Sequence, residues 1–192
     1  YNAAQIREIS VLDGGKTVYI YAVDYRDDVR GMGGPILEIY VSSPVKDVLR
    51  MQCFHFKGDR RKYPSFELKD EQLTIDVTEK DEKTILTSGN ISLEIEKNPC
   101  SFTYFYKGKK LTSVGEYFGR RMLSYITTDD GAYMRAQLDL DIGEKVYGFG
   151  EKFTPFVKNG QVVDVWNEDG GTTSEISYKS IPFYVTNRGY GV

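Results

Sequence analysis

The sequence has 192 residues, of which 40% are hydrophobic and 14% aromatic, and this apolar content excludes a disordered chain. Its 25 basic and 28 acidic residues give a formal net charge of −3, so the concentrated basic surface of a nucleic-acid binder is not expected. The nearest basic cluster, residues 57–62, is interrupted by Asp59; it is interpreted as a solvated turn, with an anion-binding patch as the alternative. No uncharged run approaches ~18 residues, so no membrane-spanning helix is expected.

Short runs of β-branched and aromatic residues predict strands along the chain. In chain order they are 17–23, 36–41, 48–56, 73–78, 84–87, 91–96, 101–106, 134–142 and 181–186. In 73–78, 91–96 and 134–142 every second residue is apolar, which places one face of a strand on a core and the other in water. Turn signals such as 13–15 and 107–109 separate the runs by about 8 to 12 residues, a spacing typical of an antiparallel β-sandwich or barrel. We expect one all-β domain over residues 1–192.

The last strand is followed by a turn signal, Asn187 to Gly191, and the sequence stops at Val192. A hairpin whose second strand is missing predicts that the polypeptide continues beyond this point. A short tail without a partner strand is the alternative.

The sequence lacks the residues that several kinds of chemistry require. The two cysteines, Cys53 and Cys100, have no metal-binding spacing, and His55 is the only histidine, so zinc is not expected. Both cysteines lie in apolar surroundings, which favours buried free thiols and a reducing, cytoplasmic compartment, with a disulfide as the alternative. His55 is interpreted as a core or half-buried strand residue. Gly148-Phe149-Gly150 lacks the third glycine of a dinucleotide fingerprint, so no cofactor is expected, and the glycines are interpreted as a bend or close approach.

The stretch 146–173 differs from the rest because it combines aromatic rings, including the only tryptophan, Trp166, with many amides and carboxylates. Sugar-binding sites need this mixture of flat apolar surfaces and planar hydrogen-bonding groups. The turn signal Asp169-Gly170-Gly171 predicts that Asp169 lies at an exposed loop tip. The alternative is an ordinary hairpin loop anchored by a buried tryptophan.

Two carboxylate pairs, Glu144 with Glu151 and Glu168 with Asp169, are candidates for an acid and a nucleophile. Glycoside hydrolysis needs two carboxyl groups that face each other across the bond, about 5–5.5 Å apart in retaining enzymes. Adjacent residues of an extended chain point to opposite faces, and nothing in the sequence places Glu151 opposite a partner. We therefore expect no catalytic residue in this chain.

Residues 146–192 resemble the end of the N-terminal domain of glycoside hydrolase family 31, in its α-xylosidase-like branch. The matching motifs are Tyr147-Gly148-Phe149-Gly150-Glu151-Lys152-Phe153-Thr154, Lys158-Asn159-Gly160-Gln161, Trp166-Asn167-Glu168-Asp169-Gly170-Gly171-Thr172 and the run from Tyr178 to Val192. The resemblance implies a galactose-mutarotase-like antiparallel β-sandwich that precedes a catalytic (β/α)8 barrel. It also implies that the catalytic aspartates lie on that barrel and not in residues 1–192.

The same resemblance implies a sugar-binding role for one loop. In the Trp-Asn-x-Asp-Gly-Gly-Thr motif the aspartate, here Asp169, reaches substrate hydroxyls, with Thr172 and Trp166 as weaker candidates. Phe149, Glu151 and Lys152 are interpreted as structural, including a Glu–Lys pair at the base of the loop.

The expected function is therefore that of a non-catalytic domain of a retaining α-glycosidase, an α-xylosidase or α-glucosidase, that docks on its own catalytic barrel. The expected substrate is an α-linked oligosaccharide or xyloside. A free-standing carbohydrate-binding or interaction sandwich is the alternative. An apolar docking face that lacks its barrel also predicts some homo-oligomer at high concentration.

Overall fold

The computed structural model describes residues 1–24, 36–56, 70–117, 120–168 and 176–192. The cluster at 57–62, Asp169 and Thr172 lie outside the described residues. The chain divides into two compact units, Tyr1–Asp139, called unit 1, and Leu140–Val192, called unit 2. The regular structure of the described part of the chain is nearly all β, and its one helical element is the 3-10 turn η1 (Asp13–Gly15). None of its helices is long and apolar enough to cross a membrane.

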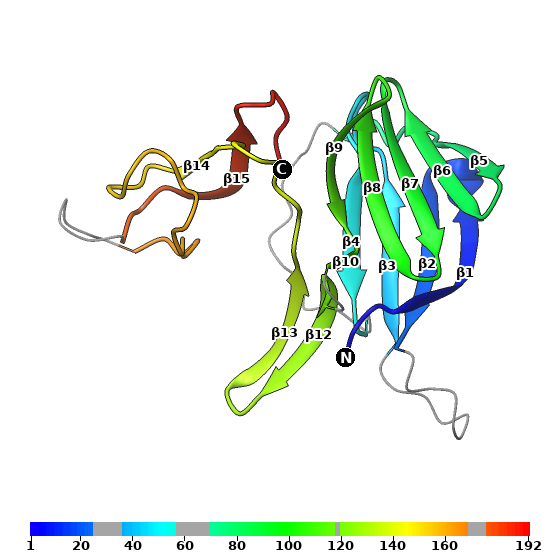
Figure 1. Ribbon diagram of the computed structural model, residues 1–192, viewed down its shortest axis with the longest axis horizontal. Helices are drawn as coiled ribbons and strands as arrows, with labels where there is room; N and C mark the ends of the chain where they lie inside the picture. Colours follow the sequence, from blue (N-terminus) through cyan, green and yellow to red (C-terminus); the bar gives the residue numbers. More distant parts are fainter. Residues whose placement is uncertain (25–35, 57–69, 118–119, 169–175) are drawn as a thin grey trace. The chain divides into compact units, whose positions relative to one another are not determined.

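Unit 1 contains two antiparallel sheets whose strands follow one another in chain order (Figure 1). The first sheet has the order β1-β2-β3-β4 and the second the order β5-β6-β7-β8-β9. The strands of the first are β1 (Gln5–Leu12), β2 (Thr17–Val23), β3 (Leu37–Ser42) and β4 (Arg50–Phe54). Those of the second are β5 (Asp76–Lys80), β6 (Lys83–Ser88), β7 (Ile91–Lys97), β8 (Cys100–Tyr106) and β9 (Lys109–Val114).

The core lies between these two sheets because alternate residues of β2, β3, β6 and β7 point inward. Ile20 of β2 and Ile39 of β3 are fully buried in the same cluster as Leu93 of β7 and Phe102 of β8. Fully burying one such side chain contributes about 1.5–3 kcal/mol relative to its exposure. A single core shared by two antiparallel sheets confirms the predicted β-sandwich.

Two predicted strands differ from the observed ones. Residues 73–75 belong to a crossing between the sheets, since the Leu73 amide donates to the Ser43 carbonyl and the Ile75 amide to the Gly15 carbonyl. Strand β5 therefore begins only at Asp76. The predicted strand 134–142 was too long, because β13 (Gly131–Ala136), which pairs with β12 (Leu123–Thr128), ends at Ala136. Beyond Ala136, Leu138 still packs against the core, but Leu140 is exposed and Ile142 fully so.

The short strands β10 (Glu116–Tyr117) and β11 (Arg120–Arg121) pair with each other and complete unit 1. Unit 2 is built on the antiparallel pair β14 (Val146–Gly150) and β15 (Ser180–Thr186). The turn after β15 lies where the sequence predicted it, and beyond it Val192 exchanges two backbone hydrogen bonds with Tyr184, at 2.8 and 2.9 Å.

Candidate functional site

Strands β14 and β15 approach each other closely at the two glycines of the Gly-Phe-Gly motif. A Cβ on Gly148 would lie 2.8 Å from the Phe183 carbonyl oxygen, and a Cβ on Gly150 would collide with the Lys179 carbonyl oxygen. All three residues of the motif have positive φ, including Phe149 at 67°, and the register shifts between Gly148 and Gly150. This bulge confirms the interpretation of the glycines as a bend and a close approach.

The segment that carries Trp166 is held against the start of β15 by its backbone and by polar side chains. The Lys152 ammonium donates to the Asp164 carbonyl oxygen and to the Ser180 hydroxyl, both at 2.7 Å. The Ser180 hydroxyl donates to the Trp166 carbonyl oxygen at 3.0 Å, and the Ser180 amide donates to the Asn167 side chain at 2.8 Å. The Trp166 backbone is therefore tied on both sides to other parts of unit 2.

The Trp166 side chain, in contrast, faces solvent, with 72% of its surface exposed. The sequence alternative of a buried tryptophan anchor is therefore wrong. Beside the ring lies an open hollow of about 340 Å3, lined by Asp164, Val165, Trp166, Glu168 and Ile176. The hollow combines an aromatic face with two carboxylates, which is the mixture that sugar hydroxyls and C–H faces require.

The sequence interpretation gave Lys152 a structural role through a Glu–Lys pair, but Lys152 donates to Asp164 and Ser180 instead. Glu151 pairs instead with Lys179 at 3.0 Å, and both of these side chains are 64% exposed. Neighbouring residues on an extended backbone point to opposite faces, so Glu151 and Lys152 have separate partners. The sequence feature that could have indicated these partners is the lysine next to the Gly-Phe-Gly bulge, because its side chain can reach across to β15 from there.

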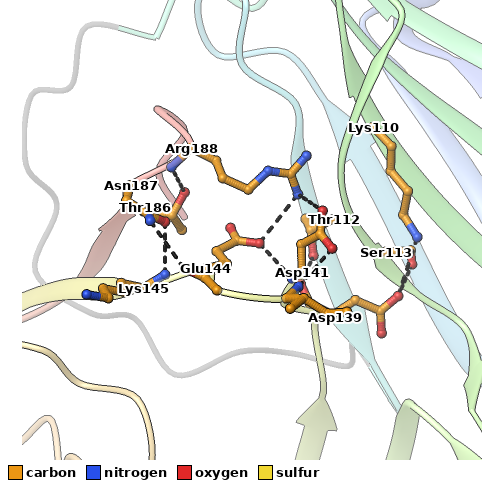
Figure 2. A network of polar contacts seen from close by, with 12 residues as sticks. Lys110, Thr112, Ser113, Asp139, Asp141, Glu144, Lys145, Thr186, Asn187 and Arg188 are labelled. Carbon is orange, nitrogen blue, oxygen red and sulfur yellow. Dashed lines mark hydrogen bonds and ion pairs between the residues drawn. The ribbon is translucent and has the colours of Figure 1, made fainter.

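A second network fixes the turn after β15 (Figure 2). The Arg188 guanidinium lies 3.4 Å from the Glu144 carboxylate and 3.5 Å from the Asp141 carboxylate, and the Glu144 side chain is fully buried. The Lys145 amide donates to the Asn187 side chain at 2.9 Å. Burial alone would raise the pKa of Glu144, but hydrogen bonds from Tyr190, the Asp141 amide and Arg188 hold it below its ordinary value. Glu144 and Arg188 therefore act as a structural pair.

The loop between β14 and Trp166 is organised in the same way. The buried Lys158 ammonium donates to the Thr154 hydroxyl and the Pro155 carbonyl oxygen, both at 2.8 Å. Burial, followed by the nearby charge of Lys152, lowers the pKa of Lys158. Asn159 accepts the Val146 amide hydrogen at 2.9 Å. The polar residues of this motif are used to hold the loop.

The cysteines and the histidine offer no reactive pair. His55 is half-buried; its Nδ1 lies 3.1 Å from the Ile36 carbonyl oxygen, to which it donates, and its ring lies 4.1 Å from the Tyr125 ring. Cys53 and Cys100 are free thiols, and burial raises the pKa of both to about 12. A thiol with such a pKa is a poor nucleophile near neutral pH. Within the described ranges no three His, Cys, Asp or Glu side chains are grouped to hold a metal ion.

Comparison with known proteins gives consistent matches. The family model described as the glycosyl hydrolase 31 N-terminal galactose mutarotase-like domain matches residues 37–192. An α-xylosidase of Emericella nidulans is 41% identical over 172 residues, which cover 79% of this chain and 22% of that protein. The α-xylosidase XylQ of Lactiplantibacillus pentosus is 36% identical over 182 residues, which cover 93% of this chain and 23% of that protein.

Solved structures share the fold. A GH31 dextranase of Flavobacterium johnsoniae superposes with a TM-score of 0.75 at 22% identity, over 100% of this chain and 22% of that one. The cycloalternan-forming enzyme of Listeria monocytogenes gives 0.72 at 20% identity, over 99% of this chain and 17% of that one. The chain thus spans between a fifth and a quarter of the length of the two α-xylosidases that it matches, 22% and 23%.

Proposed function

The chain belongs to the glycosyl hydrolase 31 N-terminal galactose mutarotase-like domain family, and on that premise we propose that it serves a retaining α-glycosidase as a non-catalytic domain. In this proposal unit 2 docks on a catalytic barrel and lends the loop that begins at Trp166 to the sugar-binding site. The substrate is an α-xyloside in the first instance, because the two relatives at 36% and 41% identity are both α-xylosidases.

The exposed Trp166 ring above a hollow is the observation that carries the proposal. The backbone on both sides of the ring is fixed by Lys152 and Ser180, yet the ring itself is 72% exposed. A rigid, solvent-facing aromatic next to carboxylates is arranged to meet the apolar face of a sugar. Asp169 follows within three residues, and we propose that it accepts hydrogen bonds from substrate hydroxyls, with Thr172 beside it.

The carboxylates of unit 2 that the structure describes support a binding role over hydrolysis by this chain. Glu144 is fully buried and pairs with Arg188, and Glu151 pairs with Lys179. Glu168 and Asp164 line the open hollow beside Trp166, where carboxylates can accept hydrogen bonds from sugar hydroxyls. We therefore propose that the catalytic acid and nucleophile come from the barrel.

The outward side chains of β15 support the docking role. Ile181, Phe183 and Val185 alternate along the strand, and they are 53%, 51% and 42% exposed. A row of three large apolar residues on one strand face is unusual for a surface that stays in water. In this proposal the barrel covers that row.

The direct test is hydrolysis of aryl α-xyloside and aryl α-glucoside by the longer protein that contains this domain. Asp169→Asn should lower kcat/KM by about 10- to 100-fold, since charge-assisted hydrogen bonds are worth about 1.5–3 kcal/mol. Trp166→Ala should lower it about tenfold through loss of the contact between its ring and the sugar. Asp129→Asn, at an exposed turn residue of unit 1, is the matched control and should leave activity unchanged. If neither site substitution changes the activity, the domain is a scaffold and not part of the sugar-binding site. A protein inactive on both substrates would overturn the glycosidase assignment.

The docking face has its own test in sedimentation of the 192-residue chain. At high concentration the chain should self-associate through β15, and Phe183→Lys should shift it toward monomer. A chain that is monomeric at every concentration contradicts an apolar docking surface.

A further inference from the structure

The outward face of the first sheet of unit 1 carries a row of aromatic rings. Tyr19 of β2 lies 5.2 Å from Tyr40 of β3, and Tyr40 lies 5.9 Å from Phe54 of β4, measured between ring centroids. The alternate residues of β2 and β3, such as Ile20 and Ile39, are fully buried in the core. The rings therefore lie on the side of the sheet that faces away from the core, where packing of the sandwich does not require them.

A hollow of about 530 Å3 opens over part of this row, with Tyr40 and Phe54 among its lining residues. Sites for small ligands typically measure about 300–1,000 Å3 and combine aromatic surface with a few placed polar groups. The polar groups here come from β3, β4 and the chain that follows β4, and they include Ser42, Gln52 and Asp70.

The polar side of the hollow is organised by one arginine. The Arg50 Nε donates to the Ser42 hydroxyl at 3.0 Å, and its Nη1 lies 3.5 Å from the Asp70 carboxylate. Gln52 lies two residues further along β4, directly opposite Tyr40 in the β3–β4 register, and is exposed. The Tyr40 hydroxyl donates to Glu38 at 3.3 Å, which orients its ring. Aromatic and hydrogen-bonding groups are thus held side by side.

The charges of the described residues that line the hollow balance. Among the described lining residues, Lys16 and Arg50 stand against Asp13 and Asp70. A site for a phosphate or another anion would show an excess of cations, and a site for a cation would show the reverse. The balance favours a neutral ligand that has both apolar faces and many hydroxyl groups.

We propose that this hollow binds a neutral oligosaccharide, with sugar rings against Tyr40 and Phe54 and hydroxyl groups on Arg50, Gln52 and Asp70. Two rings 5.9 Å apart offer consecutive apolar surfaces, which favours a ligand longer than one sugar. The inference rests on the proposed function for its ligand class, but it concerns residues of unit 1 alone.

Calorimetric titration of the 192-residue chain with maltotriose and with isomaltotriose tests the site. Saturable binding of at least one trisaccharide is expected. Tyr40→Ala should weaken it about tenfold through loss of ring contact, and Gln52→Ala about three- to tenfold through loss of a hydrogen bond. Gln52 is exposed, so its substitution leaves the fold intact even where Tyr40→Ala does not. Tyr106→Ala, at an exposed tyrosine of the second sheet, is the matched control and should bind as wild type does.

The variant Trp166→Ala separates this inference from the proposed function. Binding that Gln52→Ala weakens and Trp166→Ala leaves unchanged supports the unit 1 site, whatever the longer protein hydrolyses. Binding that only Trp166→Ala removes overturns the inference and leaves the proposed function standing. No binding of either trisaccharide, or affinity unchanged in both Tyr40→Ala and Gln52→Ala, also overturns it.

Discussion

Replacing Glu144 with glutamine removes a negative charge from the interior of unit 2 and keeps the size of the side chain. The Glu144 side chain is 0% exposed and lies 3.4 Å from the Arg188 guanidinium. A glutamine oxygen can still accept a hydrogen bond from the Asp141 amide, whose nitrogen lies 2.8 Å from the wild-type carboxylate, but the ion pair is lost. Loss of such a buried contact costs about 1–3 kcal/mol. Amides that exchange through opening of unit 2 should therefore exchange roughly 5- to 150-fold faster.

Hydrogen exchange followed by mass spectrometry measures this effect, with peptides from β7 in unit 1 as an internal reference. Glu151→Gln is the matched control, because Glu151 and its partner Lys179 are both 64% exposed. Exposed ion pairs of this kind contribute about 0–1 kcal/mol, so this variant should exchange nearly as wild type does. If the amides of unit 2 exchange as slowly in Glu144→Gln as in wild type at pH 7, the buried carboxylate has no stabilising role.

The effect should also depend on pH in a defined direction. Burial would raise the pKa of Glu144, but hydrogen bonds from Tyr190, the Asp141 amide, Arg188 and Thr186 lower it below the ordinary value of 4.5. A carboxyl group whose pKa is lower in the folded state stabilises the fold above the ordinary value and loses this contribution as the pH falls through the folded value. The difference between wild type and Glu144→Gln should be complete at pH 7 and shrink below 4.5. A difference that persists at pH values far below this range contradicts the assignment.

Three further outcomes follow from the same structure. Phe102→Ala should lower the free energy of unfolding of unit 1 by about 3–5 kcal/mol in urea titrations, because the ring is 1% exposed at the centre of the core. Gly150→Ala should disrupt the β14–β15 pairing in amide-protection measurements, since its Cβ would collide with a backbone carbonyl oxygen. Gly160 is also at positive φ but has open space around it. Gly160→Ala should therefore cost only the backbone strain of about 1–2 kcal/mol. Cys53 and Cys100, whose pKa burial raises to about 12, should react slowly with iodoacetamide at pH 8 in the folded chain and rapidly in urea; fast alkylation of the folded chain would contradict their burial.

Three strands were predicted well whether or not their alternate residues are buried, since β2 and β7 line the core and β15 is largely exposed. Strand β2 was found with its predicted bounds, Thr17–Val23, and β7 and β15 were found within one residue of theirs. Strand β1 was missed because its register shifts between Ile6 and Glu8, and a bulge breaks the period of two on which the prediction depends. Local sequence therefore located strands in the core and at the surface, and it missed β1, where a bulge changed the pattern.

The site shows a similar division. Composition pointed to the stretch around Trp166 as a place where sugars could bind, and the exposed ring beside a hollow agrees with that chemistry. Sequence could not give the exposure of the ring or the partner of Lys152, because Asp164 and Ser180 lie 12 and 28 residues away along the chain. Which long-range acceptors a lysine meets depends on how the strands pair, and no short-range pattern encodes that.

The contrast between backbone and side chain at Trp166 is the physical basis of the binding role that we propose for this segment. In a core anchor the aromatic ring is buried and its packing positions the backbone. Here the order is reversed, since hydrogen bonds from Ser180 and Lys152 position the backbone and the ring contributes little to packing. A large apolar ring held in water gains free energy only when something covers it. A rigid backbone lowers the entropy cost of that contact, so the geometry favours a ligand that arrives from outside unit 2 over further folding within it.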